Sequence, residues 1–175
     1  MLLKKFQFYT ILKAAIKAQE IDMVKHLLKQ GTDPDYIPLF GPSIIGTAIE
    51  FGTPEILKEL LKKSSDPNVK LHSNQYSKIT PLFMAITLNK DEMVKVLLQD
   101  KRCQIFTENY VTLFWGSFDI GGAGIIKAPG AYQYAIEHGN PKIIDTFKHI
   151  RAIEIKNHFK KKKASNPKPS FKIIK

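Results

Sequence analysis

The stretch TPLFMAITLNKDEMVKVLLQ, residues 80–99, contains two apolar patterns separated by a short polar joint. In the first pattern Leu82 precedes the small Ala85 by three residues, and in the second Met93-Val94 precedes Leu97-Leu98 by four. Spacings of three and four residues place side chains on one face of a helix. We therefore predict two short amphipathic helices, joined by the polar residues between the two patterns.

The same arrangement occurs four times along the chain, which is typical of a repeat protein. Each copy has a small Ala followed by Ile and, about eight residues later, a pair of apolar residues; the Ala residues are Ala15, Ala48, Ala85 and Ala135. The steps between them are 33, 37 and 50 residues, so insertions separate the later copies. The predicted helix-pair units are at about residues 8–35, 43–68, 80–105 and 130–150, with an insertion at 106–129. We predict a basic C-terminal helix and tail at 151–175, because Ile150, Ile153, Ile155 and Phe159 continue a helical pattern beyond the fourth unit.

Glycine and proline mark the joints inside these units. Gly52 and Gly139 stand just after a first helix, where we expect a residue with left-handed backbone geometry. Thr53-Pro54 and Asn140-Pro141 follow, a pattern that predicts a helix N-cap and then Pro at the first helical position.

The ends of the units carry turn sequences, GTDPD at residues 31–35 and SSDPN at residues 64–68. With the opening Thr80-Pro81-Leu82, they resemble the ankyrin repeat, whose pattern begins Thr-Pro-Leu-His-x-Ala-Ala and has a period of 33 residues. The resemblance covers about residues 8–150. The sequence departs from the motif where Lys13, Gly46, Phe83 and Gln133 replace its His, and where Lys101-Arg102-Cys103 replaces its closing Gly-Ala-Asp.

This resemblance implies an all-α fold: a short solenoid of four stacked helix pairs with a hairpin-like insertion between repeats 3 and 4. It also implies a non-enzymatic module for protein–protein interaction, which binds a protein partner through its concave face. In such a stack, insertions form fingers beside that face. We expect fingers at residues 36–42, 69–79 and 105–129.

The largest insertion is rich in aromatic and β-favouring residues. These flank Gly116-Ser117, a pair suited to a two-residue type II′ hairpin turn, with Trp115 and Phe118 near the tip. Two alternatives are open: an aromatic finger that anchors a partner, or a segment that buries Phe114 and Trp115 against the stack. The partner-binding residues we predict are Tyr36, Phe40, Tyr76, Tyr110, Phe114, Trp115 and Phe118.

The positive charge is concentrated in the tail. The net charge is +11, and residues 151–175 contribute +8 of it from nine basic residues and Glu154. The tail is either a solubilising end that also caps the last repeat, or a weak contact for nucleic acid or acidic lipid and a signal for the nucleus. The residues for such a contact are Lys160, Lys161, Lys162, Lys163 and Lys168.

We expect no catalytic, cofactor-binding or metal-binding residues. Cys103 has no neighbouring general base in sequence, and the five His residues lack metal-ligand spacing. Gly121-Gly122-Ala123-Gly124 lacks the Lys-Ser/Thr ending of a phosphate-binding loop and fits a return strand better. No stretch is long and apolar enough for a transmembrane segment, and we expect a monomer.

Lysine outnumbers arginine 25 to 2, a bias found in AT-rich genomes such as those of several intracellular bacteria. Similar ankyrin proteins of these bacteria act as translocated effectors on host proteins. We therefore expect the protein in the cytoplasm or, as an effector, secreted into the host cell. A further alternative is that the chain is the targeting part of a larger enzyme.

Overall fold

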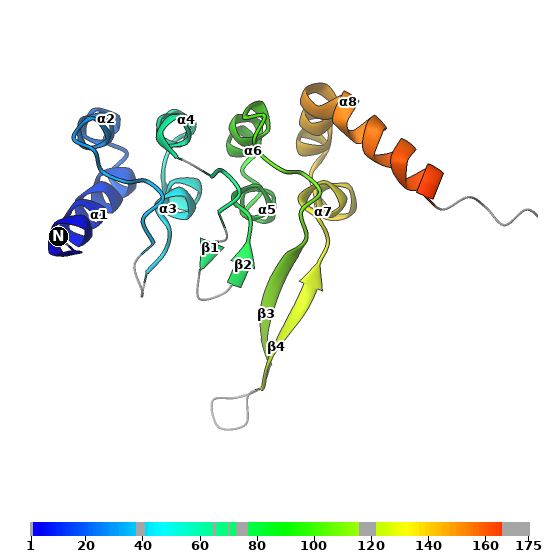
Figure 1. Cartoon of the computed structure of the whole chain (residues 1–175), viewed down its shortest axis with the longest axis horizontal. Helices are drawn as coiled ribbons and strands as arrows, with labels where there is room; N and C mark the ends of the chain where they lie inside the picture. The colour runs from blue at the N-terminus through cyan, green and yellow to red at the C-terminus, as the bar shows by residue number, and fades with distance from the viewer. Residues whose placement is uncertain are drawn as a thin grey trace, which may run out of the picture.

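The computed structural model describes residues 2–37, 41–64, 66–69, 71–72, 77–115 and 122–165. Eight helices in this part of the chain form four pairs stacked side by side, with the first helices in one row and the second helices in another (Figure 1). The predicted all-α solenoid is confirmed. The pairs are α1 (Leu2–Lys17) with α2 (Ile21–Lys29), α3 (Ile44–Phe51) with α4 (Pro54–Lys63), α5 (Pro81–Thr87) with α6 (Asp91–Gln99), and α7 (Ala131–His138) with α8 (Pro141–Ser165).

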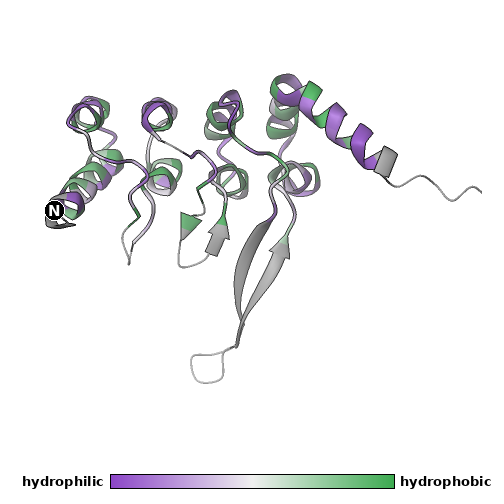
Figure 2. Cartoon of the chain, viewed as in Figure 1, coloured by the Kyte–Doolittle hydropathy of each residue, from purple (hydrophilic) through white to green (hydrophobic). Residues whose placement is uncertain are grey.

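One continuous apolar core runs through the stack, because each pair packs against the next along both rows. The small residues of the repeated pattern lie inside it, and Ala48, Ala85 and Ala135 are completely buried. A single helix pair cannot bury its own apolar face, so the stacking supplies the hydrophobic stabilisation. Exposed residues of the second helices are mostly polar, and Figure 2 shows hydrophilic stretches along this outer row.

The joints differ from the prediction at the two glycines. Gly52 and Gly139 have φ values of −83° and −75°, so the expected left-handed geometry is wrong. The reason for glycine is a close approach of the backbone. A Cβ atom would lie 2.8 Å from the carbonyl oxygen of Ala48 at the first joint and 2.4 Å from that of Ala135 at the second.

Left-handed residues occur instead at the joints of the other two pairs. Gln19 and Asn89 have φ values of 59° and 56°. The predicted N-caps are confirmed: Thr53 Oγ1 accepts a hydrogen bond from the N–H of Ile56, and Asn140 Oδ1 accepts one from the N–H of Ile143. The four joints therefore have two backbone conformations: two joints contain a glycine with negative φ, and two contain a polar residue in the left-handed conformation.

The turns after the second helices are more regular than the sequence indicates. In each of the first three units an aspartate side chain accepts a hydrogen bond from the N–H two residues further on. These residues are Asp33, Asp66 and Asp100, with distances of 2.9, 2.8 and 3.0 Å. Asp100 therefore forms the third turn even though the Gly-Ala-Asp motif is missing there.

Two antiparallel strand pairs project from the connections between units (Figure 1). The first consists of β1 (Leu71–His72) and β2 (Ser77–Ile79), and the second of β3 (Asn109–Trp115) and β4 (Gly122–Ala128). Within the second pair Asn109 lies opposite Ala128, and Trp115 lies opposite Gly122. β4 includes most of the glycine-rich segment, as the return-strand interpretation predicted.

The predicted two-residue turn at Gly116-Ser117 is wrong, because that turn would pair Trp115 with Phe118. The observed register leaves residues 116–121 between the strands, and these lie outside the described residues. The register also sets Gly122 and Ala123 opposite the two aromatic residues that end β3.

One predicted boundary also differs from the helices. α1 begins at Leu2 rather than at about residue 8. The expected helix beyond the fourth unit is present, since α8 continues to Ser165 with one interruption at Arg151, whose φ and ψ of −120° and 19° are not helical. The first part of the basic tail is therefore a helix that leaves the stack at an angle (Figure 1).

Candidate functional site

Three connections extend to the same side of the stack, beside the first helices, and we call residues 36–42, 69–79 and 105–129 the fingers (Figure 1). β3 of the third finger lies next to β2 of the second. The third finger is the longest, and its strands run well beyond the helices.

The structure accounts for only part of the predicted partner-binding set. Tyr36 is half-buried, and its ring meets that of Tyr9 edge-on at 5.8 Å between centroids. The Tyr9 hydroxyl in turn donates a hydrogen bond to the carbonyl oxygen of Pro42, so Tyr36 contributes to packing at the first finger. Phe40, Tyr76 and Phe118 lie outside the described residues. For Tyr110, Phe114 and Trp115 the description covers the backbone of β3.

The middle of the row of first helices is closed to solvent. All residues from Ile44 to Ile49 in α3 and from Pro81 to Ile86 in α5 are buried. β1 contributes to this cover, since a Cβ atom on Gly46 would lie 3.6 Å from Cδ1 of Leu71. Along these buried segments of α3 and α5, helix side chains therefore contribute little to the accessible surface.

Exposed apolar side chains in this row occur on α1 and α7 at its two ends, and at Phe51, the last residue of α3, which is 42% exposed. Phe6 and Ile11 of α1 are 51% and 48% exposed, and Ile136 of α7 is 42% exposed. Ile136 belongs to the repeated Ala-Ile pattern, yet its counterparts Ile49 and Ile86 are buried. The sequence pattern does not distinguish Ile136 because its exposure depends on the position of its unit in the stack.

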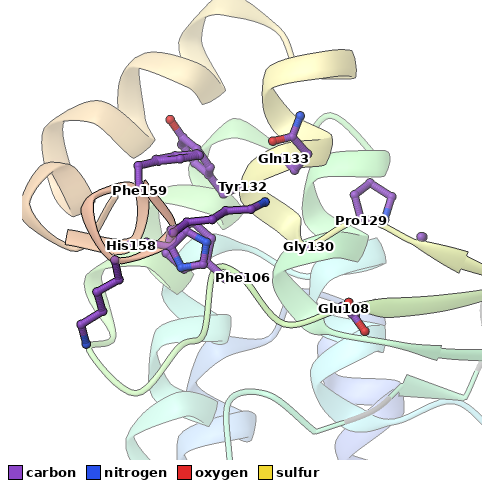
Figure 3. Close-up of a pocket in the computed structure, with 11 residues that line it drawn as sticks. Phe106, Glu108, Pro129, Gly130, Tyr132, Gln133, His158 and Phe159 are labelled. Atoms are coloured by element: carbon purple, nitrogen blue, oxygen red, sulfur yellow. The ribbon is translucent and has the colours of Figure 1, made fainter. Parts of the chain in front are cut away.

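An open pocket of about 830 Å³ lies at the base of the third finger (Figure 3). It is formed where the two ends of the finger meet α7 and the extension of α8. The residues that line it are Phe106, Glu108, Ala128, Pro129, Gly130, Tyr132, Gln133, His158, Phe159, Lys161 and Lys162. The sequence analysis missed this pocket because its three segments are far apart in the chain.

Aromatic rings form one wall of the pocket (Figure 3). The imidazole of His158 stacks on the ring of Phe106, with 3.6 Å between centroids and 12° between planes. Tyr132 meets Phe106 edge-on at 5.8 Å and Phe159 at 6.1 Å. Tyr132 is also in edge contact with the fully buried Phe147, which connects this wall to the core.

The predicted lysines lie on the last turns of α8. Lys160, Lys161 and Lys162 are exposed, and the second and third of them line the pocket. Lys163 belongs to the same helix, and Lys168 lies outside the described residues. The helix therefore brings positive charge to the rim of an aromatic pocket, which composition alone does not reveal.

The buried charge next to this region has a structural role. Arg151, only 9% exposed, donates hydrogen bonds to the carbonyl oxygens of Leu98 at 2.9 Å, Asp100 at 2.6 Å and Cys103 at 3.2 Å. Its guanidinium also bonds Glu154 at 2.6 Å. Arg151 therefore joins α8 to the carbonyl end of α6, and its kinked backbone lies at this contact.

The other arginine of the chain makes the same kind of contact one unit earlier. Arg102 donates to the carbonyl oxygens of Leu61 at 2.8 Å and Ser64 at 2.9 Å, at the end of α4. The hydrogen bond from Arg102 to Asp100 also lowers the pKa of that carboxyl group. Both arginines thus bind backbone carbonyl groups at or just after the end of the second helix of the preceding unit.

The described residues offer little for catalysis. Burial raises the pKa of the Cys103 thiol to about 12, so the thiol is protonated at neutral pH. Within the described ranges no three or more His, Cys, Asp or Glu side chains gather where a metal ion would bind. No described helix has the length and apolar character needed to cross a membrane.

A stack of two-helix units with fingers on one side defines a helical-repeat protein, a class that presents extended binding surfaces. The family model for ankyrin repeats, in three copies, matches residues 11–109, and the chain therefore belongs to the ankyrin repeat family. Ankyrin repeats are in general non-enzymatic modules for protein–protein interaction. α7 and α8 add a fourth helix pair after the matched region.

A solved structure shares this fold. The ankyrin repeat protein from Leishmania major is 17% identical, with a TM-score of 0.58. The match covers 83% of the present chain and 47% of that protein, so the chain spans about half its length. No curated protein sequence matches the chain.

Proposed function

We propose that the chain is a non-enzymatic module that holds a protein partner on its concave side, with the third finger as the main contact. The length of that finger carries the proposal: two paired strands of seven residues each extend beyond the helices. An ankyrin unit needs only about 33 residues, so packing of the units does not require this extension. β3 also ends at the only Trp of the chain, a residue type common at the centre of interfaces.

Removing the finger tests the proposal. Residues 109–128 are replaced by a short Gly-Ser linker, and partner capture is measured by mass spectrometry beside a control in which the exposed Ile153 becomes Ser. We expect the shortened protein to keep its melting temperature and lose the proteins that the control retains. Equal capture by the two proteins would contradict the proposal.

We also propose a setting for this activity: a translocated effector of an intracellular bacterium that acts on a host protein. The excess of lysine over arginine, 25 to 2, supports this origin. The effector would work in the host cytoplasm, or in the nucleus if its lysine cluster directs import. A reporter fusion that stays inside the bacteria during infection would rule this setting out.

A second candidate function is docking on a polyanion, either nucleic acid or anionic lipid. The exposed Lys160, Lys161 and Lys162 at the end of α8 favour it. Deleting residues 160–175 should leave the melting temperature unchanged and lower the salt concentration that elutes the protein from heparin. Unchanged elution would exclude this candidate. An aromatic contact through Trp115 should instead depend weakly on ionic strength.

A further inference from the structure

The pocket at the base of the third finger has the size and composition of a binding site. Its volume of about 830 Å³ is large enough for one bulky side chain together with neighbouring peptide groups. Tyr132 is anchored through the buried Phe147, and the stacked pair of Phe106 and His158 stands beside it. An aromatic or large apolar group that enters here would meet ring faces and edges already held in position.

The charge at the rim of the pocket determines which ligand groups are favoured next to the aromatic or large apolar group that enters it. Lys161 and Lys162 line the pocket from α8, and the exposed Lys160 precedes them. Glu108 is the only acidic residue among the lining groups. The rim is therefore net positive, and carboxylates on either side of an aromatic anchor would be attracted to it.

The neighbouring strand favours a polypeptide as the occupant. Within the described residues β4 pairs with β3 alone, and β3 faces β2, so β4 forms the outer edge of its sheet. The edge ends at Ala128, which lines the pocket together with Pro129. An extended peptide can pair its backbone N–H and C=O groups with such an edge and reach the pocket at its end. A nucleotide has no peptide groups for this pairing.

We propose that this pocket, the aromatic-lysine pocket, receives an extended acidic segment of a protein partner through one aromatic or large apolar side chain. This inference rests on the proposed function and specifies the chemistry of the partner at the finger base. The aromatic wall binds the anchor, Lys161 and Lys162 attract the flanking carboxylates, and β4 pairs with the peptide backbone.

Fluorescence anisotropy with synthetic peptides tests the proposal on the full chain. The probe is a labelled peptide with one Trp between runs of Asp and Glu; comparison peptides carry Ser for Trp or Lys for the acids. Phe159→Ser and the double variant Lys161→Glu/Lys162→Glu alter the pocket. The controls lie at exposed positions of α8 outside the lining: Ile153→Ser also replaces an apolar residue by Ser, and Lys148→Glu/Lys156→Glu makes the same double charge change.

We expect each pocket variant to weaken binding of the Trp probe about tenfold or more, and each control to change it by less than about threefold. The Ser and Lys peptides should bind about tenfold more weakly than the probe. Equal affinity of the Trp and Ser peptides would overturn the proposal, because binding would then depend on charge alone. Equal losses in the pocket and control variants would also overturn it.

Two further results would overturn this inference without affecting the proposed function. One is displacement of the Trp probe by a fluorescent nucleotide at equal concentration, which would assign the pocket to nucleotides. The other is probe binding that is unchanged in the pocket variants while capture of proteins still requires residues 109–128. If the protein without residues 109–128 still captured the same proteins, while the pocket variants still weakened binding of the Trp probe, the proposed function would be contradicted instead.

Discussion

At the residue scale, small side chains determine how closely the helices approach. Ala48 and Ala85 are completely buried where first helices of adjacent units meet, and Gly52 permits a backbone contact that a Cβ atom would prevent. Interiors are close-packed, so a larger or charged group at these positions has no space and no partner.

We expect Ala48→Glu to unfold the stack, because it buries a carboxylate between helices at a cost of about 3 kcal/mol or more. Thermal unfolding followed by circular dichroism measures the effect. The same substitution at the exposed Ala152 is the control and should leave the melting temperature nearly unchanged. A wild-type melting curve for Ala48→Glu would show that the repeat register is wrong.

The two arginines provide a second prediction. Arg151 binds three backbone carbonyl groups and one carboxylate, whereas a lysine offers a single ammonium group on a flexible chain. Arg151→Lys should therefore lower the free energy of unfolding by about 2 kcal/mol in urea titrations. Arg102→Lys should cost less, since that side chain is 48% exposed. Equal losses would argue against burial as the cause.

The buried thiol gives a third prediction. The pKa of Cys103 is raised to about 12 by burial, and its side chain is 2% exposed. Because the thiolate is the reactive form, a disulfide reagent at pH 8 should modify the folded protein at least about 100-fold more slowly than the urea-unfolded protein. The rate should rise as the pH increases. Similar rates in the two states would show that the C-terminal end of the stack opens readily.

At the element scale, the third finger is the element that packing of the helix pairs does not require. The strands at residues 109–115 and 122–128 pair in a regular register, and the second ends at the base pocket. The register also places Trp115 at the end of β3, next to the connection between the strands. The side chain either contacts a partner or packs on this protein.

Trp115→Ala separates these alternatives when stability and binding are measured on the same variant. If Trp115 anchors the partner, binding should weaken by about 2 kcal/mol or more, with almost no change in melting temperature. We expect this outcome. If Trp115 is buried within the chain, stability should fall by about 3 to 5 kcal/mol. A large loss of stability with unchanged binding would contradict the role of Trp115 as an anchor.

At the scale of the whole molecule, the repeated units could be predicted because their signal is local. The apolar spacing around Ala85 in α5, and of Met93-Val94 and Leu97-Leu98 in α6, predicts the buried face of each helix, and these residues are buried in the structure. N-caps were also predictable, since Thr53 and Asn140 act on residues three positions away. Periodicity and capping depend on neighbours in the chain.

The features that sequence reasoning missed depend on contacts between distant segments. The aromatic-lysine pocket joins Phe106, Tyr132 and Phe159, which share no motif. Gly139 was assigned a left-handed geometry because the clash of a Cβ atom with the preceding helix turn is visible only in three dimensions. The helix at the start of residues 151–175 could be predicted from its apolar spacing, but the placement of its lysines at the pocket could not, because the pocket forms only where distant segments meet.

The central claim is that the partner binds on the side of the fingers. Hydrogen–deuterium exchange of the chain, alone and with the protein that it captures, tests this claim most directly. We predict that exchange slows in the fingers, above all at residues 109–115 and 122–128, and is unchanged in α2, α4 and α6 on the outer row. Slower exchange confined to those outer helices, with the fingers unaffected, would contradict the account.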